Sequence, residues 1–417
     1  MEKFQRYTDI GFLLALLLIP FVPTFGRIDI VGPQYLYLSI ILFGYIIIKL
    51  ISIKSFKFKL NYSISFFLLF LIMALLSIVN SLNVTESLIE FIKHFVTFLI
   101  LVFTFSIFNN NRTYINSAIV VVVGFLFFET CYILKFFIDN YSFENPPSRL
   151  REFQGLAYNQ NIASNSILVK IPLAIFLLVK TKTKIYKYLL LAIIAISVFD
   201  ILIIGSRSAI YGIYLLTLFL IGIFLFARKF NFLNINKKNL LKSVFIILSV
   251  FVLQNFLYTN SMNLKALDRS AQLDDYSTNY RLNLWESSFE MIKEFPLLGI
   301  GIGNWKIISI KYSKNYMSEY QVPKHAHNDF IQIMAETGIL GGLFYLFFLI
   351  SPFYFIVKNY SLFSTREKEL SVFLTFSLIF IGIDAFFNFP RARPYSLLNL
   401  FWVIAFMYNL KANKINE

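Results

Sequence analysis

Few residues of this sequence belong to the types that cross-link small domains or bind metals. The 417 residues include a single cysteine, Cys131, so no disulfide can form within the chain. Zinc fingers and clusters held by several cysteines are excluded for the same reason. Cys131 lies in an apolar run, which predicts an inert buried thiol. Charged residues are also scarce, because they make up 15% of the chain, whereas soluble domains carry about 25%.

Apolar residues take the place of the missing charges. They make up 58% of the chain, with 50 phenylalanines and 24 tyrosines, which excludes a disordered protein. A membrane-spanning helix needs about 20 mostly apolar residues, and the sequence predicts an all-α membrane protein with twelve such helices. The alternation typical of outer-membrane barrel strands is not visible. The predicted spans are 10–25, 35–53, 62–80, 91–108, 114–138, 162–179, 186–205, 208–227, 240–258, 330–357, 370–388 and 394–410.

The net charge of +15 reflects membrane topology rather than nucleic-acid binding. Lysines and arginines gather in alternate gaps between the predicted spans, as in 180–187, and the other gaps hold few. Because cytoplasmic loops of membrane proteins are rich in basic residues, this bias predicts that both termini are cytoplasmic. The first span is not followed by an Ala-x-Ala cleavage site, so we expect it to remain as a membrane helix.

One polar segment, 259–329, separates the ninth and tenth predicted spans. Loops of that length are uncommon and usually functional. Apolar residues spaced three and four apart predict a helix over 280–294, ended by Pro296 and followed by a flexible turn at Gly299, Gly301 and Gly303. The apolar residues of that helix are Leu282, Leu284, Trp285, Phe289 and Ile292. We therefore divide the chain into spans over 1–258, a small outer helical subdomain over 259–329, and spans over 330–417.

Five ionisable residues lie inside the predicted spans, where such residues are rare and usually functional. They are Glu129, Lys135, Lys170, Asp200 and Asp384. Counted from the outer ends of their helices at about 1.5 Å per residue, all five lie in the outer half of the membrane. This pattern predicts a polar cavity that opens outward rather than a pathway across the membrane. The similar depths of Glu129 and Lys170 lead us to expect an ion pair between them.

The three histidines stand close to predicted membrane boundaries. His325 and His327 belong to the segment His-Ala-His-Asn-Asp just before the tenth span, and His94 begins the fourth. Residues two apart point to different sides of a helix, and no set of further ligands surrounds the pair, so neither a metal nor another cofactor is expected. For His94 the sequence favours an ordinary polar or interfacial contact.

Arginines recur at the predicted outer ends of the spans. Arg207 lies in a short turn between two spans, Arg281 lies in the outer segment, and Arg391 and Arg393 lie in the last outer turn. Placing a guanidinium there costs desolvation energy unless an anion meets it, and its fork suits phosphate oxygens. Each arginine alone is typical of a lipid-headgroup contact. Together with an outer histidine they predict a site for a phosphate-bearing lipid.

These segments resemble the O-antigen ligase family. His327-Asn328, a gap of nine residues and the run Gly338-Ile-Leu-Gly341 are similar to the characteristic motif of that family. The resemblance covers the membrane topology and is densest over 281–345. The further segments that look like the family are RLNLW at 281–285, PLLGIG at 296–301, NQN at 159–161, and Arg207 in its short turn.

The resemblance implies a fold, a reaction and a set of site residues. It implies a membrane-embedded glycosyltransferase of the GT-C type that transfers a glycan from undecaprenyl diphosphate to an acceptor hydroxyl, as on lipid A–core, at the periplasmic face of the bacterial inner membrane. It implies His327 as the general base and Arg207 and Arg281 as diphosphate contacts, with no metal or other cofactor. The neighbouring candidates for substrate binding are His325, Asn328, Glu336, Arg391, Arg393 and Asn161.

Three other functions stay open at the level of sequence. An O-antigen polymerase and a protein O-oligosaccharyltransferase use the same donor and differ in the acceptor, which the sequence does not identify. A transporter of lipid-linked sugars belongs to another class. It would carry charges at the middle of the membrane and broken helices related by internal repeats, whereas this chain has its intramembrane charges in the outer half.

Overall fold

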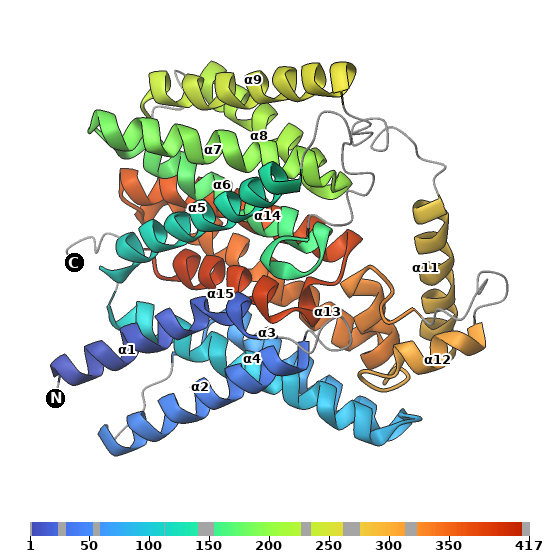
Figure 1. Ribbon diagram of the computed structural model, residues 1–417. Helices are drawn as coiled ribbons and strands as arrows, with labels where there is room; N and C mark the ends of the chain where they lie inside the picture. Colours follow the sequence, from blue (N-terminus) through green and yellow to red (C-terminus); the bar gives the residue numbers. More distant parts are fainter. Residues whose placement is uncertain are drawn as a thin grey trace. The chain divides into compact units, whose positions relative to one another are not determined.

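The computed structural model describes residues 2–23, 31–52, 59–111, 113–140, 154–226, 235–261, 276–312 and 323–410. The elements assigned within these ranges are helices (Figure 1). Nine helices of the described ranges are long and apolar enough to cross a membrane. They are α2 (Val31–Ser52), α3 (Tyr62–Ser77), α4 (Val84–Asn110), α5 (Tyr114–Asn140), α6 (Gln160–Lys180), α7 (Lys184–Ile204), α8 (Arg207–Phe226), α13 (Asp329–Asn359) and α14 (Thr365–Phe387). The chain is therefore a helical membrane protein, as predicted.

Helices also stand at the other three positions where the sequence predicts spans. They are α1 (Glu2–Leu17), α9 (Lys237–Ser261) and α15 (Pro394–Tyr408). Since α1 and α15 contain 16 and 15 residues, they are shorter than the roughly 20 residues of an ordinary span. The total of twelve membrane crossings stays a prediction.

The chain folds as two compact units, each made from segments far apart in the sequence. Unit 1 comprises residues 1–111, 274–355 and 385–408, and unit 2 comprises residues 112–273, 356–384 and 409–417. Unit 1 contains α1 to α4, α11 (Tyr276–Glu294), α12 (Trp305–Tyr312), most of α13 and α15. Unit 2 contains α5 to α9 and most of α14.

In unit 1, α15 packs against α4 and α2. The ring of Phe108 in α4 meets the rings of Trp402 and Phe406 in α15 edge to face, with centroids 5.5 and 5.2 Å apart. Such pairs of aromatic rings add to the energy of burial. This contact holds the second half of α15 against α4.

Helix α13 is broken at Gly338, whose backbone has φ 77° and ψ 170°. The segment Pro296–Gly301 docks at the break: the amide of Ile339 donates to Pro296 O at 2.9 Å, and the amide of Gly301 donates to Glu336 O at 3.0 Å. A Cβ atom at Gly338 would lie 2.0 Å from a backbone oxygen of that segment. The turn expected from the sequence is confirmed, and hydrogen bonds and close backbone contacts hold its glycines against α13.

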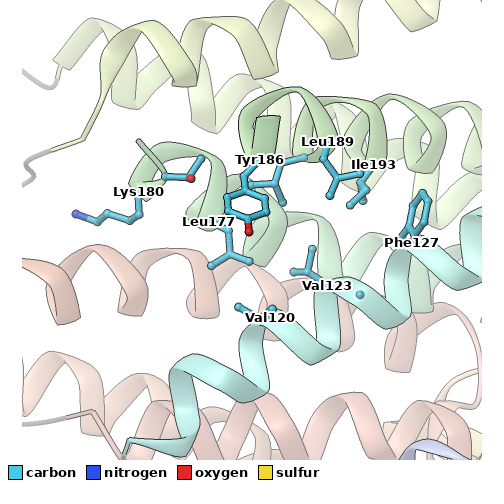
Figure 2. Close-up of a pocket in the computed structure, with 11 residues that line it drawn as sticks. Val120, Val123, Phe127, Leu177, Lys180, Tyr186, Leu189 and Ile193 are labelled. Carbon is cyan, nitrogen blue, oxygen red and sulfur yellow. The ribbon is translucent and has the colours of Figure 1, made fainter. Parts of the chain in front are cut away.

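In unit 2, α6 is buried on almost every side and packs against α5, α7, α8 and α9. The second half of α6 is apolar all round, as expected at such a position, and the buried Asn165 and Lys170 of its first half pair with Asp384 and Glu129. An apolar groove of about 450 Å³ remains between α5, α6 and α7 (Figure 2).

Candidate active site

His327 stands in unit 1 at the entrance to α13. Its backbone adopts the left-handed conformation with φ 55°, which is uncommon for a residue other than glycine and occurs often at functional sites. The next residue, Asn328, caps the helix because its Oδ1 accepts from the amide of Ile331 at 3.1 Å. His327 therefore lies in the turn just before α13 begins, outside the helix.

Phe389 lies against both histidines of the His-Ala-His segment. The ring of His325 stacks on it with centroids 4.3 Å apart and planes 13° apart, and the ring of His327 meets it edge-on at 5.1 Å. The guanidinium carbon of Arg393 lies 5.5 Å from the centroid of the same ring. Phe389 therefore sets the orientation of both imidazoles, a role that the sequence does not signal.

The two imidazoles are neutral at neutral pH. Burial, followed by the charge of Arg281, lowers the pKa of His327 to about 4. Burial, followed by the charge of Arg391, lowers the pKa of His325 to about 3. Within the described part of the chain, Nδ1 of His325 and of His327 is buried and lacks a hydrogen-bond partner. A neutral imidazole with an unpaired ring nitrogen can accept a proton.

Helix α11 brings Arg281 into the neighbourhood of His327. One turn after Arg281, the indole of Trp285 donates to Ala326 O at 3.0 Å, and its ring meets Phe386 edge-on at 5.6 Å. The neighbouring residue Leu284 belongs to a buried cluster that joins α11, α12 and the loop before α13. Because Trp285 is anchored directly beside the histidine segment, Arg281 is held near enough to affect the pKa of His327.

Only part of the predicted apolar pattern of this helix is buried. Leu284 is buried and Trp285 and Ile292 are partly buried, as expected for a face that packs on the protein. Leu282 and Phe289 are 51% and 48% exposed, because they lie outside the buried face of α11, which contains Leu284 and Ser288. The helix that the spacing predicts over 280–294 is confirmed by α11.

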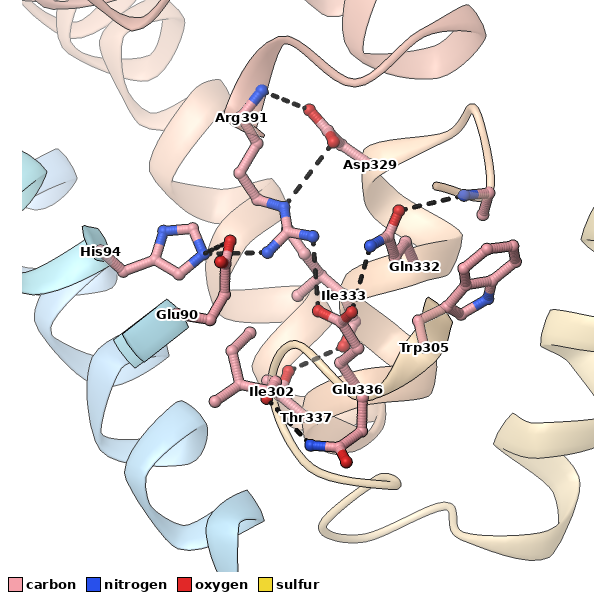
Figure 3. A network of polar contacts seen from close by, with 12 residues as sticks. Glu90, His94, Ile302, Trp305, Asp329, Gln332, Ile333, Glu336, Thr337 and Arg391 are labelled. Atoms are coloured by element: carbon pink, nitrogen blue, oxygen red, sulfur yellow. Dashed lines mark hydrogen bonds and ion pairs between the residues drawn. The ribbon is translucent and has the colours of Figure 1, made fainter. Parts of the chain in front are cut away.

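A second feature of unit 1 is the buried side chain of Arg391 (Figure 3). Its Nη1 lies 2.9 Å from Nε2 of His94 in α4, and its Nη2 donates to Oε2 of Glu336 in α13 at 3.3 Å. Its amide donates to Oδ2 of Asp329 at 2.9 Å, and its Nε lies 3.7 Å from the other oxygen of that carboxylate. One guanidinium therefore joins the turn before α15 to two membrane helices.

Further polar contacts extend this network on both sides. Gln332 donates to Oε1 of Glu336 at 3.1 Å and accepts from the amide of Ala326 at 3.1 Å, so the network reaches the histidine segment. On the α4 side, Glu90 lies 3.9 Å from His94 and pairs with Lys93 at 3.0 Å. The contact predicted for His94 is thus confirmed as a buried polar one.

The described side chains of the network and of the histidine segment are not grouped as metal ligands. Within the described ranges, no group of three or more His, Cys, Asp or Glu side chains is placed to hold a metal ion. The carboxylates of Glu336 and Asp329 point to the guanidinium of Arg391 instead (Figure 3).

Comparison with known proteins connects this geometry to a family. The family model described as O-antigen ligase matches residues 191–346. The matched region holds Arg281, His327 and the break at Gly338. Residues 191–346 are therefore similar to the O-antigen ligase family. The resemblance expected from the motifs is confirmed there, and Asn161, Arg391 and Arg393 lie outside the matched residues.

Curated relatives agree with the ligase match over short regions. A candidate polysaccharide ligase of Rickettsia felis is 30% identical over 25% of this chain and 26% of its own length. The exopolysaccharide production protein ExoQ of Rhizobium meliloti is 23% identical over 34% of this chain and 32% of its own length. A candidate polysaccharide ligase of Rickettsia typhi is 27% identical over 31% of this chain and 32% of its own length. The alignments thus span about a quarter to a third of these relatives.

Two residues that the ligase resemblance implicates stand in unit 2. Arg207 begins α8, directly after Gly205 in the left-handed conformation and Ser206. Asn161 lies in the first turn of α6, where its amide donates to Oδ1 of Asn159 at 3.0 Å. His327 and Arg281 stand in unit 1. Within unit 1 the structure brings His327 and Arg281 together, and the roles of all the predicted site residues stay predictions.

Buried polar side chains of unit 2 lie near these two residues. Asn165 donates to Oδ1 of Asp384 at 2.7 Å and to Oγ of Ser208 at 3.1 Å, so α6, α8 and α14 meet one turn from Asn161 and beside Arg207. The ion pair expected between Glu129 and Lys170 is confirmed at 2.7 Å between Oε2 and Nζ. Of the other predicted intramembrane charges, Asp200 is buried and Lys135 is exposed.

Proposed function

We propose that this protein is an O-antigen ligase. It transfers a glycan from undecaprenyl diphosphate to a hydroxyl of lipid A–core at the periplasmic face of the bacterial inner membrane, in a fold of the GT-C type with both termini in the cytoplasm. The observation that supports this most directly is the neutral imidazole of His327, set in a strained turn beside Arg281. The match of residues 191–346 to the O-antigen ligase family supports the reaction class.

His327 would act as the general base. It takes the proton of the acceptor hydroxyl while that oxygen bonds to the anomeric carbon of the donor glycan. The bond between the anomeric carbon and the diphosphate oxygen breaks in the same reaction, and its electron pair leaves with the lipid diphosphate. A base positioned in this way typically contributes about 10²–10⁴-fold to the rate.

Arginines would stabilise the leaving group. The diphosphate gains negative charge as the bond breaks, so a fixed guanidinium lowers the energy of the transition state more than that of the bound substrate. Arg281 is the guanidinium that interacts with His327 within unit 1, and we assign the second diphosphate contact to Arg207. This chemistry requires no metal or other cofactor.

Donor binding would also tune the base. The charge of Arg281 contributes to the low pKa of His327, and a diphosphate beside Arg281 offsets that charge. The pKa of His327 then rises towards its ordinary value of about 6.5, which makes the imidazole a stronger base at the moment when the donor is present.

We assign Arg391 and Glu336 to positioning rather than to substrate contact. Their charged atoms face each other in a buried network that also holds Asp329, the first residue of α13. His325 and Arg393 lie against Phe389 beside the base, where they can contact the glycan. Asn328 fixes the turn as the cap of α13.

A polymerase is the second candidate. A similar protein, ExoQ, is named for exopolysaccharide production, and a polymerase would use another prenyl-linked repeat as the acceptor. The proposed chemistry of the base and the arginines is the same in both reactions, so only the acceptor separates them.

Analysis of glycolipids in a deletion strain distinguishes these functions. A ligase predicts that long lipid-linked polymer accumulates while lipopolysaccharide remains uncapped. A polymerase predicts lipopolysaccharide capped with a single repeat. Normal capped lipopolysaccharide together with an altered glycan on proteins would refute both and indicate protein glycosylation.

A further inference from the structure

The groove between α5, α6 and α7 has the size and the walls of a ligand site. Its volume of about 450 Å³ falls in the range of roughly 300–1,000 Å³ that is usual for such sites. Its walls are formed by apolar side chains, among them Val123 and Phe127 of α5, Leu177 of α6 and Ile193 of α7 (Figure 2). An apolar chain is the occupant that such walls favour.

The rim of the groove is open rather than covered by the protein. Val120 is 57% exposed, Phe127 is 40% exposed and Leu189 is 45% exposed. All three stand on helices that are apolar and long enough to cross a membrane. In a membrane, the medium that meets these side chains is the hydrocarbon of the lipids, so an acyl chain can enter the groove from the side.

One end of the groove is basic. Lys180 lies at that end and Phe127 at the other (Figure 2). Lys180 forms an ion pair with the buried carboxylate of Glu369. Two and four residues further along, Lys182 and Lys184 are exposed, and no ion pair engages them within the described residues. The sequence has no Asp or Glu between 181 and 199.

Polar groups suited to a headgroup accompany this charge. Thr181 and Tyr186 also line the groove, and Tyr186 is 58% exposed. Tyrosine is enriched at the level of lipid headgroups, where one end of its side chain is in hydrocarbon and the other in water. The groove is thus lined by Lys180 and two hydroxyl-bearing side chains in addition to its apolar walls, and the exposed Lys182 and Lys184 follow Lys180 directly in the chain.

We propose that this groove binds an anionic phospholipid, with an acyl chain between α5 and α7 and the phosphate at Lys182 and Lys184. Basic pockets between membrane helices are a usual place for anionic headgroups. The site is independent of the proposed glycan transfer, because the groove belongs to unit 2 and contains neither His327 nor Arg281. It would make the protein dependent on the anionic lipid content of its membrane.

Native mass spectrometry of the full-length protein, purified and offered phosphatidylglycerol or phosphatidylcholine, tests the proposal. The wild type should retain more phosphatidylglycerol than phosphatidylcholine. Each lysine near a membrane surface contributes about five-fold to the binding of an anionic lipid, so Lys182→Gln/Lys184→Gln should weaken retention of phosphatidylglycerol about 25-fold and leave phosphatidylcholine unchanged. Lys238→Gln/Lys242→Gln, which removes two exposed lysines of α9 in the same unit, is the matched control and should change little.

A second pair of variants tests the apolar part of the groove. Gly124 lines it, and a Cβ atom there would meet nothing within 4 Å, so Gly124→Phe should fill the groove without a clash and reduce retention of both lipids. Gly222→Phe on α8, where a Cβ is equally unhindered, is the control. Three results would overturn the proposal. The wild type could retain the two lipids equally, the variants and their controls could lose equal amounts of lipid, or inorganic phosphate alone could displace the lipid.

Discussion

Replacing Arg391 tests whether this arginine positions other residues or contacts the substrate. The side chain is 3% exposed and contacts His94, Glu336 and Asp329. Arg391→Met removes the cation but keeps most of the volume, so the principal loss is electrostatic. Removing one partner of a buried ion pair costs about 3–5 kcal/mol, because the other charge is left without compensation. We expect the free energy of unfolding to fall by that amount.

The origin of this loss can be tested with a second substitution. Glu336→Gln removes one of the carboxylates that Arg391→Met leaves unpaired, while the side-chain amide still meets Gln332. The double variant should therefore recover part of the loss, with an interaction energy between the two sites of about 0.5–3 kcal/mol. Arg393→Met is the matched control. Arg393 contacts the ring of Phe389, and such a contact is worth about 0.5–2 kcal/mol.

These differences in the free energy of unfolding can be measured by denaturant titration of the purified variants in one detergent. Tryptophan fluorescence reports the unfolding. The reasoning is refuted if Arg391→Met loses less than Arg393→Met, or if the losses of Arg391→Met and Glu336→Gln simply add. A variant of Arg391 with normal stability and weak donor binding would instead identify this arginine as a substrate contact.

Three further predictions concern charge, backbone and pH. Glu129→Lys or Lys170→Glu alone should lower membrane expression, and the double exchange should restore it, as immunoblotting of membranes would show, unless each residue has another essential partner. Gly338→Ala should destabilise the protein by at least about 1–3 kcal/mol in thermal unfolding, because its φ of 77° disfavours a side chain. Transfer should fall below about pH 5 as His327 becomes protonated, and Arg281→Gln should move that fall to higher pH, whereas an unmoved profile would contradict their coupling.

The sequence predicts the helices and the motifs well because both depend on local pattern. Apolar runs mark twelve of the described helices, and the spacing over 280–294 predicts most of α11, which covers Tyr276–Glu294, whereas α12 is not predicted. The pair of Glu129 and Lys170 could be predicted from depth alone, since charges in a membrane need partners.

Contacts between distant segments could not be predicted in this way. Phe389 lies more than sixty positions from His325 and His327, and one phenylalanine among 50 carries no local signal. The glycines before α12 look like a flexible turn, but hydrogen bonds to the broken helix α13 fix them. Arg391 looks like an exposed phosphate ligand, but its partners come from α4 and α13.

The most direct test of the central claim is glycan transfer in vitro by His327→Ala with purified undecaprenyl diphosphate glycan and lipid A–core. The account predicts a loss of about 10²–10⁴-fold in transfer, with folded protein and unchanged donor binding. The His325→Ala variant, made at the other imidazole on Phe389, should retain more transfer than His327→Ala. Transfer by His327→Ala at the wild-type rate would contradict the assignment of this imidazole as the base.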